Sequence, residues 1–189
     1  MCPNRWVLPV LLLAFELACA PAVNLRPPTP MARGRDFEMG VGFGAVSPRP
    51  VGEDPWVTAA QGWVTASVFD PIDVLLMGGY DGQYGTGGLG ARFRFLEFEH
   101  FRGGVGLELG AGWIGIELPM AAKVYDGVWL YSMPHYGTWG LDKTIRLPLG
   151  IEVGADSPTR LRLEGQLNYP DFDPYKRRVH FGVGVGYQL

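Results

Sequence analysis

A regular alternation of apolar and polar residues is the feature of this 189-residue chain that most limits what it can fold into. Successive side chains of a β-strand point to opposite faces, so a period of two predicts strands with one apolar face. No window keeps apolar residues at the i, i+3, i+4, i+7 spacing for more than one turn, which argues against long helices. The 28 glycines and 16 prolines are typical of short strands joined by turns. We therefore expect a single all-β domain.

Ten segments of the chain carry this alternation. Tight polar turns such as "DPID", "YDG" and "ADSPT" follow alternate segments, and mostly longer loops follow the others. This arrangement predicts an antiparallel up-and-down barrel with turns at one rim, loops at the other, and both ends of the barrel segment at the turn rim. Segments 62–69 and 128–136 are less regular, so eight strands is the second choice. The predicted strands cover residues 37–43, 62–69, 74–80, 89–95, 105–113, 116–124, 128–136, 145–153, 161–169 and 179–189.

The polar face of these strands carries charges of both signs interleaved with glycine. Glycine covers nothing on a solvated surface, but inside a narrow closed barrel it leaves room for long side chains from opposite walls. We expect these charges to pair as ions and plug the lumen, and the alternative is a selectivity lining around a pore. The predicted lumen charge network consists of Arg92, Arg94, Glu108, Arg146, Glu152, Arg160, Arg162 and Glu164.

Bulky aromatic residues gather near the ends of the predicted strands, which is typical of the two aromatic girdles at membrane interfaces. The alternative is that aromatic residues merely favour strands. The predicted loop-rim girdle consists of Phe43, Trp63, Tyr80, Trp113, Tyr136 and Tyr169, and the turn-rim girdle of Phe69, Phe95, Tyr125, Trp129 and Tyr187.

The alternation alone is compatible with two kinds of barrel. A transmembrane β-barrel turns its apolar face outward into lipid, whereas a soluble lipocalin-like barrel turns it inward. The glycine-rich charged face and the girdles favour the transmembrane reading. Strands of about ten residues, at ~3.3 Å per residue and tilted by ~40°, also cover roughly 25 Å, the height of an outer-membrane apolar band.

The last eleven residues, "VHFGVGVGYQL", place an apolar side chain at every second position. This stretch resembles the C-terminal insertion signal of Gram-negative outer-membrane β-barrel proteins, a family that usually ends in Phe where this chain ends in Leu. The resemblance implies residence in the bacterial outer membrane, contact with its lipid and recognition by the barrel assembly machinery. The residues that carry the signal are Phe181, Val183, Val185, Tyr187 and Leu189.

The first residues have the composition of an export signal. Arg5 precedes an apolar core at residues 6–15, and the small residues of "LACAPA" follow, which predicts a signal peptide over residues 1–20. Proline just after Ala20 disfavours cleavage there, so cleavage before Cys19 is favoured. A Pro-rich tether would then cover residues 21–35, and the barrel residues 36–189.

The three residues that end at Cys19, "LAC", resemble a bacterial lipoprotein lipobox. The resemblance implies lipid attachment at Cys19, and the alternative is an ordinary signal peptide cut nearby. In either case the mature chain keeps at most one cysteine and forms no internal disulfide.

Several functions are disfavoured by composition and spacing. The net charge of −3, without a run of Lys and Arg, argues against a nucleic-acid partner. His100, His135 and His180 have no Ser, Asp or Glu at a spacing that suggests an activated nucleophile, so we expect no catalytic residues. The sequence also lacks a Cys/His cluster, so we expect no metal and no cofactor.

The sequence thus predicts a non-enzymatic integral outer-membrane β-barrel protein with a structural, adhesive or narrow-pore role. The loops "VSPRPVGEDPWVTAAQ" and "GTWGLDKT" would face an extracellular partner that the sequence does not identify. A soluble lipocalin-like ligand-binding lipoprotein is the alternative.

Overall fold

The computed structural model describes residues 36–47, 56–80, 85–110, 113–139 and 142–189. The predicted signal peptide, the tether and Cys19 lie outside the described residues. Within them, no helix is long and apolar enough to cross a membrane. The strands are β1 (Phe37–Val46), β2 (Val57–Phe69), β3 (Ile72–Tyr80), β4 (Gly85–Glu97), β5 (Phe101–Gly110), β6 (Trp113–Glu117), β7 (Met120–Tyr125), β8 (Val128–Ser132), β9 (His135–Trp139), β10 (Asp142–Val153), β11 (Thr159–Pro170) and β12 (Arg178–Gln188).

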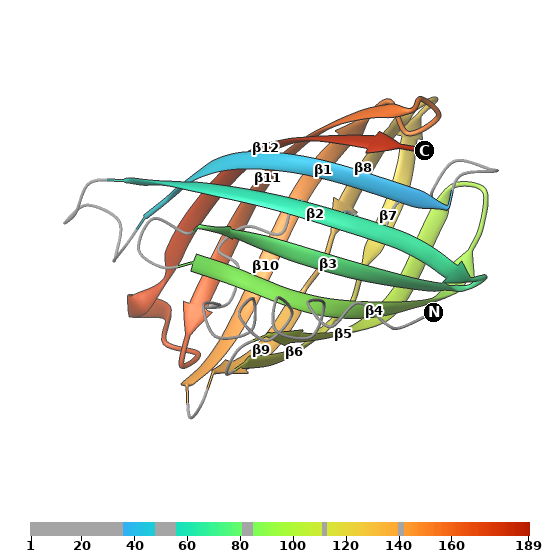
Figure 1. The fold of residues 1–189 in the computed structure, drawn as a ribbon. Coiled ribbons are helices and arrows are strands. Elements are labelled where there is room, and N and C mark those ends of the chain that lie inside the picture. Colours follow the sequence, from blue (N-terminus) through green and yellow to red (C-terminus); the bar gives the residue numbers. More distant parts are fainter. Residues whose placement is uncertain (1–35, 48–55, 81–84, 111–112, 140–141) are drawn as a thin grey trace, which may run out of the picture.

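These strands form one closed antiparallel sheet. Strands that follow one another in the chain pair with one another, except around the short strands β6 to β9, where β6 pairs with β9 and β8 with β10. The last strand, β12, pairs with β1, from Gln188 opposite Glu38 to His180 opposite Val46. Figure 1 shows the strands crossing the wall obliquely, with β1 and β12 side by side. Closure pairs the edges that an open sheet would leave exposed.

Two positions in the wall are each built from a pair of short strands. β6 and β7 follow one another beside β5, and β9 and β8 follow one another beside β10. The interruptions fall at Pro119 and Pro134, which have no amide hydrogen to donate to the ladder. Their carbonyls still accept, from Gly104 N and Leu118 N respectively, at 2.9 Å each. The barrel therefore has ten strands around its circumference, which confirms the predicted fold class and strand number.

The rims also follow the predicted arrangement. β1 begins and β12 ends at the same rim, where Leu189 N donates to Phe37 O at 3.0 Å (Figure 1). The tight turns after β2, β4, β7 and β10 lie at this rim because every neighbouring pair is antiparallel. The opposite rim carries the loops, including a short 3₁₀ turn at Pro174–Lys176.

The apolar side chains of the strands point outward and the charged ones inward. Val41 is 56% exposed and Leu163 is 51% exposed, whereas Glu152 and Arg160 are 0% exposed. A soluble barrel has the reverse distribution, because water would solvate the ions and the apolar face would form the core. The lipocalin-like alternative is therefore wrong.

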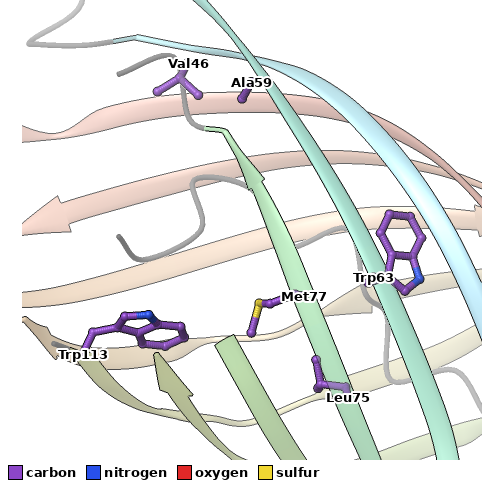
Figure 2. Packing of buried hydrophobic residues seen from close by; sticks show 6 residues of the cluster. All are labelled: Val46, Ala59, Trp63, Leu75, Met77 and Trp113. Carbon is purple, nitrogen blue, oxygen red and sulfur yellow. The ribbon is translucent and has the colours of Figure 1, made fainter. Parts of the chain in front are cut away.

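Most of the predicted girdle residues lie on the outer surface. The prediction is wrong for three tryptophans, because Trp63, Trp113 and Trp129 are buried inside the barrel. Figure 2 shows Trp63 and Trp113 with Leu75 and Met77 in one interior cluster. The tryptophans occupy inward positions of their strands. The prediction for Trp63 and Trp129 followed closeness to a strand end instead of the face. Trp113 was in phase with the outward residues of the predicted strand 105–113, but β5 ends at Gly110 and Trp113 begins β6 opposite it. The exposed girdle residues are Phe43, Phe69, Tyr80, Phe95, Tyr125, Tyr136 and Tyr187, and Tyr169 is partly buried.

Candidate functional site in the barrel lumen

Between Glu38 and Gln188 at one end and Val46 and His180 at the other, the inner face of the seam where the barrel closes carries only glycine. Glycines of β1 face glycines of β12 directly, as in the pairs Gly40 with Gly186 and Gly42 with Gly184. Side chains from neighbouring strands use this space. A Cβ added at Gly186 would lie 2.9 Å from both Arg162 Nη1 and Glu38 Oε1, and one added at Gly40 would overlap the indole of Trp63. The glycines therefore make room for large groups that cross the seam.

Arg162 of β11 is the centre of a buried ion network across this seam. Its guanidinium contacts Glu38 of β1 through Nη1 and Nη2, at 2.6 and 2.9 Å. Its Nε also donates to Glu152 of β10 at 2.7 Å. Arg160 donates to the other oxygen of Glu152 at 3.1 Å and to the carbonyl of Ala155 at 2.8 Å. We call Glu38, Trp63, Glu152, Arg160, Arg162 and Gln188 the seam cluster.

Glu38 receives further donors from both neighbouring strands. Trp63 Nε1 on β2 donates to Glu38 Oε1 at 3.0 Å, and Gln188 Nε2 on β12 donates to Oε2 at 3.1 Å. The guanidinium of Arg162 also lies 5.4 Å from the centre of the Trp63 ring, within range of a cation–π interaction. The two carboxylates and two guanidinium groups of the cluster balance in formal charge. These contacts join β1, β2, β10, β11 and β12.

A second group of charges lies on the inner wall away from the seam. Arg92 of β4 forms an ion pair with Glu117 of β6, and its Nη2 also contacts Met133 Sδ at 3.4 Å. His135 Nε2 of β9 lies 3.4 Å from Glu108 Oε2 of β5. All five side chains are buried. These side chains come from the consecutive strands β4, β5, β6 and β9 and from the β8–β9 interruption, so they gather on one stretch of the inner wall.

The structure places the predicted lumen residues in three settings. Glu152, Arg160 and Arg162 belong to the seam cluster, and Arg92 and Glu108 belong to the second group. Glu164 accepts from the hydroxyl of Tyr131 at 3.1 Å, and Arg146 is buried on the same inner wall.

Arg94 differs from the prediction, because it lies at the turn rim and not in the interior. It contacts Asp70 at 3.3 Å, Asp73 at 3.2 Å and Glu97 at 2.9 Å. The side chain of Asp70 is 85% exposed, so this pair is solvated. Arg94 keeps the inward face of its strand but sits too near the strand end to reach the buried charges.

Sequence reasoning missed several partners of the predicted charges. Glu38 and Glu117 are the carboxylates that Arg162 and Arg92 bind, and both stand between outward apolar residues in their strands. The same period-two rule could therefore have placed both carboxylates in the lumen. Nothing local to either residue indicates which arginine it meets, because Glu38 and Arg162 are 124 residues apart in the chain.

The predicted C-terminal signal residues are all on the outer face. Their exposed side chains alternate along β12 with residues that face the lumen. Their recognition by assembly machinery stays a prediction. Among the residues that the structure describes, no group of three or more His, Cys, Asp and Glu side chains could hold a metal ion.

No protein-family model and no curated protein matches the sequence. Solved structures do match. Ail, the attachment invasion locus protein of Yersinia pestis, has a TM-score of 0.39 and 10% identity over 82% of this chain and 99% of its own. The N-terminal β-barrel domain of Pseudomonas aeruginosa OprF has a TM-score of 0.40 and 14% identity over 83% of this chain and 100% of its own. A loop-deletion mutant of the Vibrio cholerae outer membrane protein OmpT has a TM-score of 0.39 and 17% identity over 78% of this chain and 62% of its own.

The deciding observation is the geometry of the chain itself, an even number of antiparallel strands closed around paired charges with the apolar face outside. The chain has the fold of an outer-membrane β-barrel.

Removing Glu38 tests the seam cluster. Glu38→Ala leaves the buried Arg162 with one of its two carboxylate partners, Glu152. We therefore expect the free energy of unfolding to fall by about 3–5 kcal/mol. The double variant Glu38→Ala with Arg162→Met removes both charges and should cost clearly less than the sum of the two single changes. Urea titration of protein folded in detergent micelles measures all three.

Asp70→Ala is the matched control for this experiment, because it removes an exposed partner of another arginine and should cost no more than about 1 kcal/mol. Equal losses for Glu38→Ala and Asp70→Ala would show that the seam cluster does not hold the barrel closed.

Proposed function

We propose that this chain is an integral protein of the bacterial outer membrane with a closed lumen, and that it acts through its loop rim and not by transport or catalysis. The observation that carries the proposal is the outward apolar face. A wall of half-exposed Leu, Val and Phe side chains is unfavourable in water and favourable in lipid. Every strand of a closed barrel also has its backbone hydrogen-bonding partners within the wall, which the bilayer interior requires.

The closed lumen is supported by the burial of its charged side chains. The ion pairs of the seam cluster and the Arg92–Glu117 pair join neighbouring and next-but-one strands on the inner wall, and all of these side chains are shielded from water. Groups that are paired and desolvated in this way fill space that a pore would leave to water and ions. A structural or adhesive role therefore agrees better with the lumen than a narrow pore.

The loop rim offers aromatic groups for contact. Phe172 stacks on Tyr136 with ring centres 6.0 Å apart and planes 4° apart. Asp171 and Phe172 both adopt positive φ angles, 53° and 58°, which non-glycine residues rarely do. Nearby, Tyr175 is exposed. Parts of both predicted contact loops, residues 48–55 and 140–141, lie outside the described residues.

The proposal also keeps the predicted attachment at Cys19. β1 begins at the turn rim, so a tether over residues 21–35 would leave the barrel on that side. Short turns face the periplasm in outer-membrane barrels. A lipid on Cys19 would then anchor in the periplasmic leaflet beside the barrel.

An arginine on the outer wall tests membrane placement. Leu76 is 48% exposed near the middle of β3, so a soluble protein would tolerate Leu76→Arg with a change within about 0.5 kcal/mol. In a bilayer the same change should cost about 2–4 kcal/mol, because it places a charge at the midplane. Unfolding titrations in phospholipid vesicles measure this cost, and gel mobility before and after boiling reports the folded fraction.

Ile72→Arg is the matched control, on the same strand and the same outer face but at the turn rim. Charge there should cost only about 0–1 kcal/mol in a bilayer. Equal tolerance of both substitutions would contradict membrane placement.

The closed lumen predicts little ion conductance. Purified barrel inserted in a planar bilayer should give no steady current, since the paired charges leave no continuous water path. A reproducible open-channel current from the unmodified protein would refute the closed lumen and favour the narrow-pore role.

A further inference from the structure

The outer wall has a gap in its cover of side chains on β11. Outward positions of this strand carry Leu161, Leu163 and Leu167, but the outward position between the last two is Gly165. The strand register sets Gly165 directly between Leu149 of β10 and Phe181 of β12. A row of large outward side chains therefore has no side chain at its centre.

This gap belongs to a groove of about 430 Å³ on the outer wall. Around Gly165 the groove is lined by Leu130, Leu149, Ile151, Leu163 and Phe181, all of which lie on outward positions of their strands. It is a shallow depression, open to the outside of the barrel, and its lining is mostly apolar.

One side of the groove is held in place by aromatic packing. The ring of Phe181 stacks on Trp56 with centres 5.9 Å apart and planes 27° apart. The same ring lies 3.4 Å from where a Cβ of Gly165 would be. Phe181 thus forms one side of the groove, directly beside the glycine.

We propose that this groove binds one acyl chain of a bilayer lipid. The inference rests on the proposed membrane placement, because only then does lipid surround the outer wall. The groove is continuous with the apolar lipid-facing surface and is lined mainly by aliphatic and aromatic side chains, so an unbranched hydrocarbon matches it. A chain in the groove contacts protein on its sides as well as beneath, and gains dispersion contacts that a chain on a smooth wall lacks.

A second copy of the barrel fits this groove less well. In a two-fold symmetric pair whose axis passes through the groove, groove would face groove. Such a contact leaves a void between the two walls, which loses packing energy. A flexible hydrocarbon chain fills the groove without that loss.

Photolabelling tests the proposal. The full barrel segment is reconstituted in nanodiscs that contain phosphatidylethanolamine with a diazirine in its acyl chain, irradiated and mapped by mass spectrometry. We expect an excess of adducts on Leu149, Leu163 and Phe181 over outward residues of the opposite wall such as Val105 and Leu107. Gly165→Leu fills the groove and should abolish that excess. A Cβ at Gly165 meets only the ring of Phe181, at 3.4 Å, and unchanged heat-modifiable gel mobility of the variant checks that it still folds.

Gly78→Leu is the matched control, since Gly78 is an exposed outward glycine on β3, outside the groove, and this variant should keep the excess. Adducts spread uniformly around the wild-type barrel, or an excess that survives Gly165→Leu, would overturn the binding of an acyl chain in the groove but not the membrane placement. If the wild-type protein is a dimer and Gly165→Leu dissociates it, the groove binds a second copy of the barrel and not a lipid acyl chain. An absence of adducts from the whole wall would overturn the membrane placement as well.

Discussion

The contact of Arg162 with two carboxylates is the interaction on which the closed lumen most depends. One guanidinium binds Glu38 on β1 and Glu152 on β10, and Trp63 and Gln188 add donors to the Glu38 carboxylate. Burying any one of these charges alone would cost several kcal/mol, so each is tolerable only with its partners in place. The arrangement therefore links the first strand of the barrel to the last ones through side chains as well as through the backbone ladder.

The glycines of the seam and the large side chains of the lumen depend on each other. Gly40 and Gly186 leave the inner face of β1 and β12 bare, and the indole of Trp63 and the guanidinium of Arg162 occupy the space. Gly150 has the same relation to the ring of Tyr131 on the neighbouring strand. Glycine weakens a strand by itself. Here the loss is offset because the missing side chains are replaced by groups that pair with those of neighbouring and next-but-one strands.

The sequence carried enough information for the wall but not for the contacts inside it. A period of two assigns the faces of β11 without ambiguity, because Leu161 and Leu163 alternate with Arg160 and Arg162. It also counted ten strands correctly, since the alternation continues through the proline interruptions of β6–β7 and β8–β9. The identity of each ion pair depends on the register of strands far apart in the chain, which no local pattern contains. Trp63 was wrongly predicted to lie on the outer surface because both faces of its segment are partly apolar. The one local sign that it faces inward is that it shares a face with the polar Gln61, two residues before it.

The outward apolar wall requires lipid around the barrel, and spin labelling along β3 measures this contact directly. The natural cysteines, Cys2 and Cys19, both precede the barrel segment, so single nitroxides can be attached at positions 74 to 77 of residues 36–189. In vesicles, labels replacing Val74 and Leu76 should collide readily with dissolved oxygen and rarely with a water-soluble nickel complex, whereas labels replacing Leu75 and Met77 should be shielded from both. High nickel accessibility at Val74 and Leu76, or lipid exposure at Leu75 and Met77, would contradict the outward apolar wall.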